Sequence, residues 1–335
     1  MDLNILWFIL IATLFCVYFF LDGMDFGIGM LIPFIGKSDK DNRKMLHAIG
    51  PTWGANEVWL LTAGGAMFAS FPGWYATMFS GFYPAMFLLL VALILRGISI
   101  EFRGKVITEK GKKWLNAGIF AGNLLTPLLV TVAIACLLRG VPIDETKEYT
   151  GNLFSLFSPF TLLVGATAIN YFLYHGAVIL DLKLPNEFGK LKDIINKSGI
   201  STILLLALTM IVSVFETDIF SKPVSTVFAI ITMVLLLLSY FSSRKKRGKI
   251  ALLLNAAFVA SVIITVFSAM FPRVMVSSTS DEYSLTIYNV SSGQYTLSVI
   301  SVITLTLLPI VIGYTVWSYW VFSKKSKEEI EETEY

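Results

Sequence analysis

Long apolar runs separated by short polar segments make up most of this 335-residue chain. Nine runs are long enough to cross a hydrocarbon core of about 30 Å. Lipid offers no partners for backbone N–H and C=O groups, so each run is expected to be helical. The pattern predicts an all-α, polytopic membrane protein with nine transmembrane helices, at residues 4–33, 53–71, 75–97, 115–138, 157–181, 200–219, 224–243, 250–271 and 296–322.

The spacing of these runs indicates two four-helix bundles plus one extra helix. The expected parts are a first unit (1–140), a second unit (141–271), an outer loop with the ninth helix (272–322) and a cytoplasmic tail (323–335). A faint repeat favours two parallel units, because Tyr-Phe-Leu-Tyr-His-Gly in the fifth run stands where Phe-Phe-Leu-Asp-Gly stands in the first.

Lys and Arg residues are distributed very unequally between the two sides of the predicted helices. If the N-terminus lies outside, all 26 fall in inner segments except Arg139, Lys147, Lys222 and Arg273. Inner loops of membrane proteins carry an excess of positive charge. We therefore expect a multi-pass protein with its N-terminus outside and its C-terminus in the cytoplasm.

The composition agrees with a membrane protein and excludes several other classes. Hydrophobic residues make up 56% of the chain, charged residues only 15%, and the mean hydropathy is +0.73. A net charge of +3 argues against nucleic acid as a partner. Cys16 and Cys136 have no motif spacing, which disfavours a disulfide framework or a zinc site. No basic region precedes the first run, so a cleaved signal peptide is not expected.

Two acidic residues, Asp22 and Asp25, interrupt the first apolar run among several glycines. Charges at such depth are rare and usually functional, so these two could form a proton relay or an ion site. The alternative is a helix that extends beyond the membrane, with both acids in the headgroup zone and paired with Lys37 or Arg43. Asp22 lies roughly 26 Å along the helix from Ile5, which leaves both readings open.

Further polar residues stand at the inner ends of the second and third runs: Trp53, Asn56, Glu57, Trp59, Arg96 and Glu101. Arg96 could pair with Glu57 or Asp25, and Glu101 could relay protons from the inner surface. The alternatives are snorkelling of the charged side chains and interfacial anchoring by Trp53. Together these residues suggest a proton or ion pathway on the inner side.

Histidine is scarce, which argues against several haems held by this chain alone. Only His47 and His175 are present, and His47 lies in the first inner loop. Haem iron needs axial ligands such as His, Met, Cys or Tyr, and His175 is only a weak candidate. On these residues alone a secondary transporter would rank first, and a purely scaffolding membrane subunit is a further alternative.

Blocks across nearly the whole chain resemble subunit II of the cytochrome bd-type quinol oxidases. The first block, Leu-Asp-Gly-Met-Asp-Phe-Gly-Ile-Gly-Met, is the most specific. The resemblance continues through residues 53–69, 79–83, 118–122, 140–142, 149–152, 269–272, 277–279, 285–286 and 317–320.

This resemblance implies a subunit of a bacterial cell-membrane complex that oxidises quinol and reduces dioxygen to water. Its expected partners are subunit I in a heterodimer, a small single-helix subunit, the quinol pool and lipids. Subunit I would ligate two haems b and one haem d. This chain would hold no haem or metal, would support subunit I and would contribute proton and oxygen access. Some members also hold a structural quinone. The secondary transporter remains the alternative.

Residue by residue, Asp25 matches the family's intramembrane acid and is expected in proton delivery, with Asp22 as its companion. Trp53, Asn56 and Trp59 match the motif of the second helix, and Trp59 lies near the proposed oxygen route. Arg96 and Glu101 match a charged cluster. Some relatives carry Asp where this chain has Gly54 and Asn116. We therefore expect Asp25, with Glu101 or Glu57, to serve the proton route, unless subunit I supplies the main one.

Overall fold

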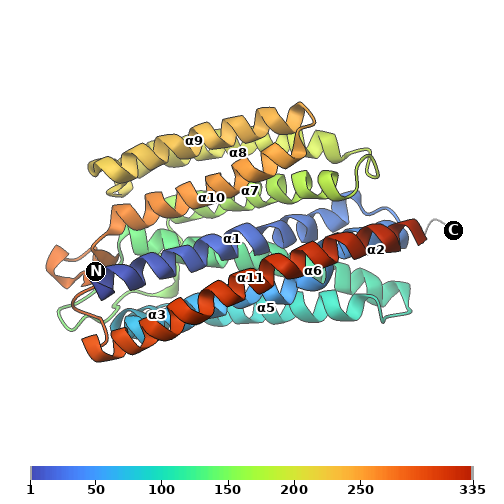
Figure 1. Cartoon of the computed structure of the whole chain (residues 1–335). Coiled ribbons are helices and arrows are strands. Elements are labelled where there is room, and N and C mark those ends of the chain that lie inside the picture. The colour runs from blue at the N-terminus through green and yellow to red at the C-terminus, as the bar shows by residue number, and fades with distance from the viewer. Residues whose placement is uncertain (1, 333–335) are drawn as a thin grey trace.

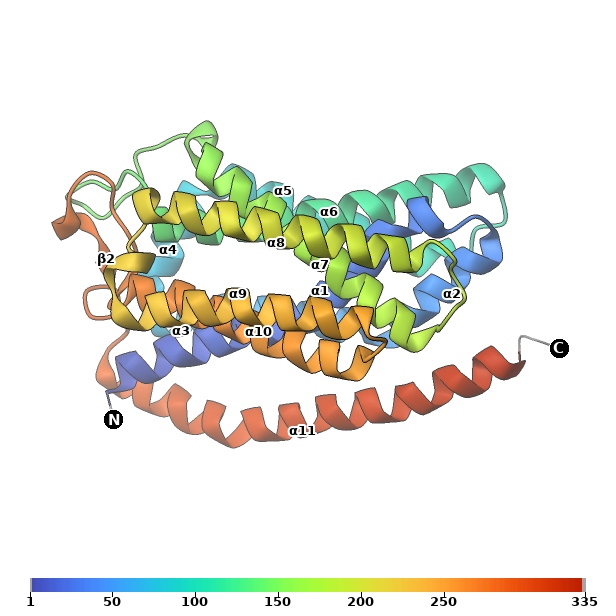
Figure 2. The ribbon, with the colours of Figure 1, turned by 90° about the horizontal axis from the view of Figure 1, so that it is seen from above.

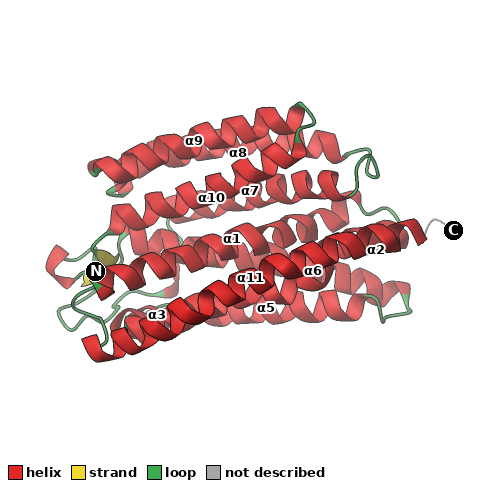
Figure 3. Cartoon of the chain, in the orientation of Figure 1, coloured by secondary structure: helices red, strands yellow, loops and turns green. Residues whose placement is uncertain are grey.

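The fold is a bundle of long helices, and the strands of the described residues are confined to one short hairpin (Figure 3). The computed structural model describes residues 2–332, without the side chains of Pro51 and residues 322–332. The helices are α1 (Leu3–Ile35), α2 (Asp39–Ile49), α3 (Trp53–Ser70), α4 (Pro72–Gly81), α5 (Tyr83–Arg103), α6 (Glu109–Arg139), α7 (Pro159–Lys183), α8 (Leu191–Glu216), α9 (Pro223–Arg244), α10 (Gly248–Met270) and α11 (Gln294–Glu332). Four short 3₁₀ helices join them, at Gly50–Thr52, Leu153–Leu156, Ile219–Ser221 and Asp281–Tyr283.

Eight helices of the described chain are long and apolar enough to cross a membrane: α1, α5, α6, α7, α8, α9, α10 and α11. They correspond to eight of the nine predicted spans. The remaining span, 53–71, coincides with α3, which is shorter and is diluted by Asn56, Glu57 and three glycines. An all-helical membrane protein is therefore confirmed, whereas the count of nine spans is not.

Helix α1 is the centre of the bundle, because it packs against α3, α6, α7 and α10. The pairs α5–α6, α7–α8 and α9–α10 are neighbours in space as well as in sequence. Helix α11 runs along the outside and contacts mainly α1 and α3 (Figure 2). The N-terminus and the C-terminal end lie at opposite ends of the bundle, with α2 near the latter (Figure 1).

The structure departs from the predicted elements at three places. The predicted helix 75–97 is two helices, α4 and α5, because Pro84 lies in the first turn of α5 and has no N–H to continue α4. The first inner loop forms α2, which Ser38 begins with a capping box. The outer loop after α10 contains antiparallel strands β1 (Arg273–Met275) and β2 (Leu285–Thr286).

Helix α11 extends into the segment predicted to be the cytoplasmic tail. Residues 323–332 continue α11 without a break, so the expected boundary at residue 323 is not a boundary of secondary structure. The last three residues of that predicted tail, 333–335, lie outside the described residues.

Helices α1 and α7 touch backbone to backbone at a pair of glycines. A Cβ added at Gly27 would lie 2.0 Å from the carbonyl oxygen of Phe172 and 2.7 Å from Cα of Gly176. The same crowding is present at Gly176, where an added Cβ would lie 2.6 Å from Cα of Gly27. Small residues allow this approach, which is a common way for membrane helices to associate.

Replacing Gly27 by Ala is therefore expected to destabilise the protein, because the new methyl group meets backbone atoms that cannot rotate away. Overpacking of this kind costs about 1–3 kcal/mol. The measurement is thermal denaturation of the purified complex in detergent. Gly64→Ala is the matched control, since a Cβ at Gly64 meets nothing within 4 Å. Equal melting temperatures for the two variants would contradict the predicted backbone contact.

Candidate functional site

A buried ion pair joins α1 to α5 inside the bundle. Asp22 and Arg96 are both fully buried. Arg96 donates from Nη1 to Oδ2 of Asp22 at 2.8 Å and from Nη2 to Oδ1 of the same carboxylate. Gly122 of α6 permits this position of α5, because a Cβ there would lie 2.6 Å from Cβ of Arg96. Bidentate pairs of this kind fix both groups in orientation.

Asp25 lies one turn further along α1 and shares the same guanidinium. Its Oδ2 accepts a hydrogen bond of 2.7 Å from Nδ2 of Asn56 on α3 and lies 3.8 Å from Nη2 of Arg96. Glu57 approaches from the next position of α3, with Oε2 3.6 Å from Nη1 of Arg96. The structure thus brings together polar residues from the first three predicted spans. Asp22 and Asp25 pair with Arg96 and Asn56, and neither forms an ion pair with Lys37 or Arg43.

This cluster is not balanced in charge or in hydrogen bonds. Among the described side chains, Arg96 is the one cation within 4 Å of its three carboxyl groups, and Lys183 of α7 interacts electrostatically with Asp25 from further away. Within the described chain, Oδ1 of Asp25, Oε2 of Glu57 and Nε of Arg96 have no hydrogen-bond partner. An apolar interior tolerates buried charges only when they are paired. With two cations for three carboxyl groups, one negative charge stays uncompensated unless a carboxyl group holds a proton.

Glu101, by contrast, lies outside the cluster. Its side chain is 56% exposed and pairs with Lys105 at 2.7 Å. Trp59 is buried in the core, and Trp53 packs against Gly97 of α5. Of the two acids proposed to assist Asp25, the structure places Glu57 beside it and Glu101 at the surface.

Sequence reasoning missed Tyr319 of α11, which belongs to the network. Its hydroxyl donates a hydrogen bond of 2.7 Å to Oδ1 of Asn56, whose amide nitrogen binds Asp25. Tyr319 lies within a block that carries the family resemblance, at residues 317–320. No periodicity or spacing in the sequence pairs it with a residue of α3, so the contact required the structure.

A second group of charges lies at the end of the bundle where α2 packs. Asp39 of α2 is 2.5 Å from Nη1 of Arg103 and 3.3 Å from Nζ of Lys112. Nε of Arg103 also donates to Oδ1 of Asn116 at 2.9 Å. Hydrogen bonding from Arg103, with a contribution from Lys112, lowers the pKa of Asp39 to about 2. Helix α2 is therefore held by ionised groups across the turn between α5 and α6.

His175 of α7 is enclosed, and one of its two ring nitrogens is engaged, while Nδ1 has no hydrogen-bond partner within the described chain. The side chain is fully buried, its Nε2 lies 3.2 Å from the carbonyl oxygen of Phe20, and its ring stacks on Tyr171 at 5.7 Å. The arrangement has the features of a packed core histidine. Among the described residues, no group of three or more His, Cys, Asp or Glu could hold a metal ion.

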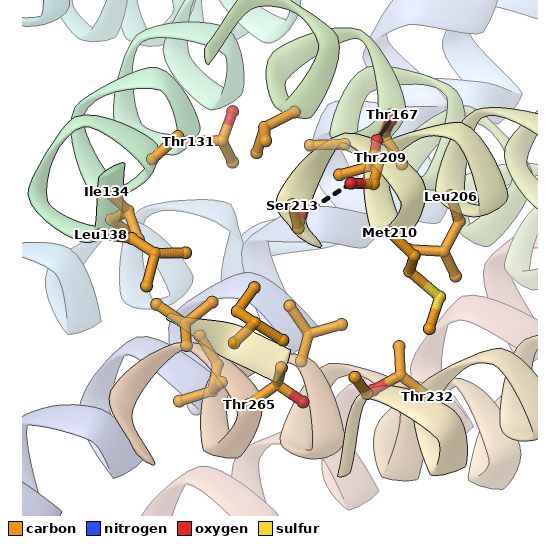
Figure 4. A pocket seen from close by; sticks show the side chains of 18 of the residues that line it. Thr131, Ile134, Leu138, Thr167, Leu206, Thr209, Met210, Ser213, Thr232 and Thr265 are labelled. Atoms are coloured by element: carbon orange, nitrogen blue, oxygen red, sulfur yellow. Dashed lines mark hydrogen bonds between the residues drawn. The ribbon is translucent and has the colours of Figure 1, made fainter. Parts of the chain in front are cut away.

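A separate apolar cavity of about 190 Å³ lies between α6, α7, α8, α9 and α10 (Figure 4). Aliphatic and aromatic side chains such as Leu138, Leu206 and Met210 dominate its lining. The hydroxyl groups at its wall are largely satisfied, as Thr167 and Thr209 show by bonding each other at 2.8 Å. The cavity therefore fits a chain-like apolar molecule and offers no charged group to one.

Comparisons with known proteins agree with one another. The family model for cytochrome bd terminal oxidase subunit II matches residues 3–322. Cytochrome bd ubiquinol oxidase subunit 2 of Bacillus subtilis (strain 168) is 39% identical over 330 residues, which cover 97% of each chain. Cytochrome bd-I ubiquinol oxidase subunit 2 of Escherichia coli (strain K12) is 33% identical over 366 residues, covering 98% of this chain and 97% of that protein.

The fold has a solved counterpart. A chain in the structure of bd oxidase from Geobacillus thermodenitrificans superposes with a TM-score of 0.74, covering 96% of this chain and 99% of that one at 15% identity. At that identity the likeness concerns the fold, and the family model and the two relatives establish the kinship. The chain belongs to the cytochrome bd terminal oxidase subunit II family.

Proposed function

We propose that this chain is the subunit of a bacterial membrane quinol:dioxygen oxidoreductase that handles protons, while a partner subunit holds the haems. Membership of the family supports the enzyme, since the Bacillus and Escherichia relatives are both named as subunits of a ubiquinol oxidase. One observation carries the proton role, namely the buried cluster in which three carboxyl groups surround one guanidinium.

The charge imbalance suggests which carboxyl group carries the proton. Asp22 receives both hydrogen bonds from Arg96, whereas Asp25 receives one from an amide and keeps Oδ1 free of any described partner. We infer that Asp25 holds a proton taken from the inner side. Glu57, with 20% of its side chain exposed, is the member of the cluster that reaches the surface. We expect Glu57 to pass the proton on to the partner subunit.

His175 is poorly placed to ligate a haem, which supports a partner as the haem-bearing subunit. His175 has no exposed surface, and the carbonyl oxygen of Phe20 and the ring of Tyr171 lie against its imidazole. Subunit I would hold two haems b and one haem d in a heterodimer. There the haem d would supply the chemistry of dioxygen reduction. Trp53, Asn56 and Trp59 stay candidates for oxygen access beside that partner.

We propose the apolar cavity as the place of a structural quinone like the one in some members of the family. Its wall would hold an isoprenoid tail through residues such as Phe160, Leu206 and Met210. The acyl tail of a lipid is also apolar and would fit the same cavity. A small single-helix subunit would be a further partner in the complex.

We also propose nine crossings, with α3 as the second, in two four-helix units plus α11. An odd number of crossings is supported by the N-terminus and the C-terminal end, which lie at opposite ends of the bundle (Figure 1). The N-terminus would then face outside and the C-terminus the cytoplasm. A transporter has less support, since α8, α9 and α10 bury no carboxylate within the described chain.

Expression of this chain with and without its subunit I partner tests the proposed function. Membranes that contain both chains should show the absorption of haems b and d together with quinol-dependent oxygen consumption. The chain purified alone should show neither. Haem retained by the chain alone, or transport of a solute by it, would contradict the proposal.

A further inference from the structure

We propose that Tyr319 of α11 is a positioning residue that keeps the amide of Asn56 turned toward Asp25. This inference rests on the proposed role of Asp25 in handling protons. It adds the ninth span to a site that the first three spans otherwise build.

The argument starts from a continuous chain of contacts. The hydroxyl of Tyr319 donates to Oδ1 of Asn56 at 2.7 Å, and Nδ2 of Asn56 donates to Oδ2 of Asp25 at 2.7 Å. Asn56 is 1% exposed, and its remaining contact, to the carbonyl oxygen of Leu21, is long at 3.5 Å. Two short hydrogen bonds at opposite ends of the amide therefore define its orientation.

The orientation of the Asn56 amide determines whether Asp25 faces a hydrogen-bond donor or an acceptor. An amide presents a donor at nitrogen and an acceptor at oxygen, so rotation by half a turn exchanges the two. Tyr319 fills the acceptor end, which leaves the donor end for Asp25. Without the hydroxyl, Oδ1 would be buried and unsatisfied, and a rotated amide would place oxygen against the carboxyl group. The hydroxyl thus controls whether Asp25 meets a donor or an acceptor.

Simple anchoring of the helix does not account for this contact. Tyrosine often lies at the membrane interface with its hydroxyl toward the headgroups. Here the hydroxyl points inward to a buried amide instead. Elsewhere α11 is joined to α1 by the bond between Trp7 and Ser301 at 2.9 Å, near the N-terminal end of the chain. The hydroxyl of Tyr319 thus gives α11 a polar contact with the acid cluster.

The test compares Tyr319→Phe with the wild type in the intact complex. The variant keeps the ring and removes only the hydroxyl. We expect quinol-driven oxygen consumption to fall about fivefold, as loss of one such hydrogen bond implies, with unchanged haem absorption and quinol KM. Tyr314→Phe, on the same helix at a site that is 63% exposed, is the control and should match the wild type. Unchanged turnover in Tyr319→Phe would overturn the inference.

Infrared spectroscopy separates this inference from the proposed function. The carboxyl band of Asp25 is identified by its loss in Asp25→Asn, and it should shift in Tyr319→Phe but not in Tyr314→Phe. A shifted band with normal turnover in Asp25→Asn would support the positioning and contradict the proton role. An unshifted band would overturn the positioning. In an Asn56→Ala background, Tyr319→Phe should have no further effect, and a full additional loss would also overturn it.

Discussion

Replacing Arg96 by Met is expected to cause the largest loss of stability of any single change in the cluster. The variant leaves Asp22 without its two hydrogen bonds in a fully buried site. Removing one partner of a buried ion pair typically costs about 3–5 kcal/mol, because the remaining charge is uncompensated. The measurement is the yield and thermal denaturation of the purified complex, where we expect little assembled protein.

Two further variants make this prediction specific. Lys105→Met removes an exposed pair with Glu101 and should cost less than about 1 kcal/mol. Adding Asp22→Asn to Arg96→Met removes the stranded charge and should recover part of the lost stability. If Arg96→Met were as stable as Lys105→Met, the buried pair would not hold the bundle together as described.

Replacing Asp25 by Asn is expected to slow the enzyme strongly without unfolding it. Asparagine keeps the shape of the side chain but cannot bind and release a proton, and a positioned acid or base contributes about 100-fold or more in typical enzymes. We expect oxygen consumption with quinol to fall about tenfold or more. Haem absorption and assembly should stay normal, since Arg96 retains its pair with Asp22.

Two further variants show whether the effect of Asp25→Asn comes from loss of the carboxyl group at this buried site or from loss of any acidic residue. Asp25→Glu keeps a carboxyl group and should retain much more activity than Asp25→Asn. Glu101→Gln changes an exposed residue outside the cluster and should stay within about twofold of the wild type. Equal losses in Asp25→Asn and Glu101→Gln would point to a surface charge effect instead of a buried relay.

The apolar pattern predicts the long helices because their burial in lipid depends on composition alone. The break at Pro84, the helix α2 and the hairpin β1–β2 depend on local turns and on packing of the outer loop, which hydropathy does not report. Pro84 was visible in the sequence, but a proline inside an apolar run is compatible with either a kink or a new helix. Boundaries of this kind therefore needed the structure.

The site was predictable in its residue types but not in its pairing. Acids at Asp22, Asp25 and Glu57 are conspicuous because charge is rare in apolar runs. Which of them binds Arg96 depends on the rotation of α1 against α5, and sequence does not determine that rotation. Sequence also does not determine that the side chain of Glu101 is exposed. Nor does it determine that Tyr319 contacts Asn56, which lies 263 positions away in the chain.

The most direct test follows proton uptake when the fully reduced complex is mixed rapidly with dioxygen. A pH-sensitive dye reports proton uptake at the cytoplasmic face of the complex in reconstituted vesicles, and haem absorption reports the reaction with oxygen. The account predicts that Asp25→Asn slows uptake of protons and completion of oxygen reduction together, while the first binding of dioxygen keeps its normal rate. Proton uptake at the wild-type rate in Asp25→Asn would contradict the claim that this chain delivers protons through the buried cluster.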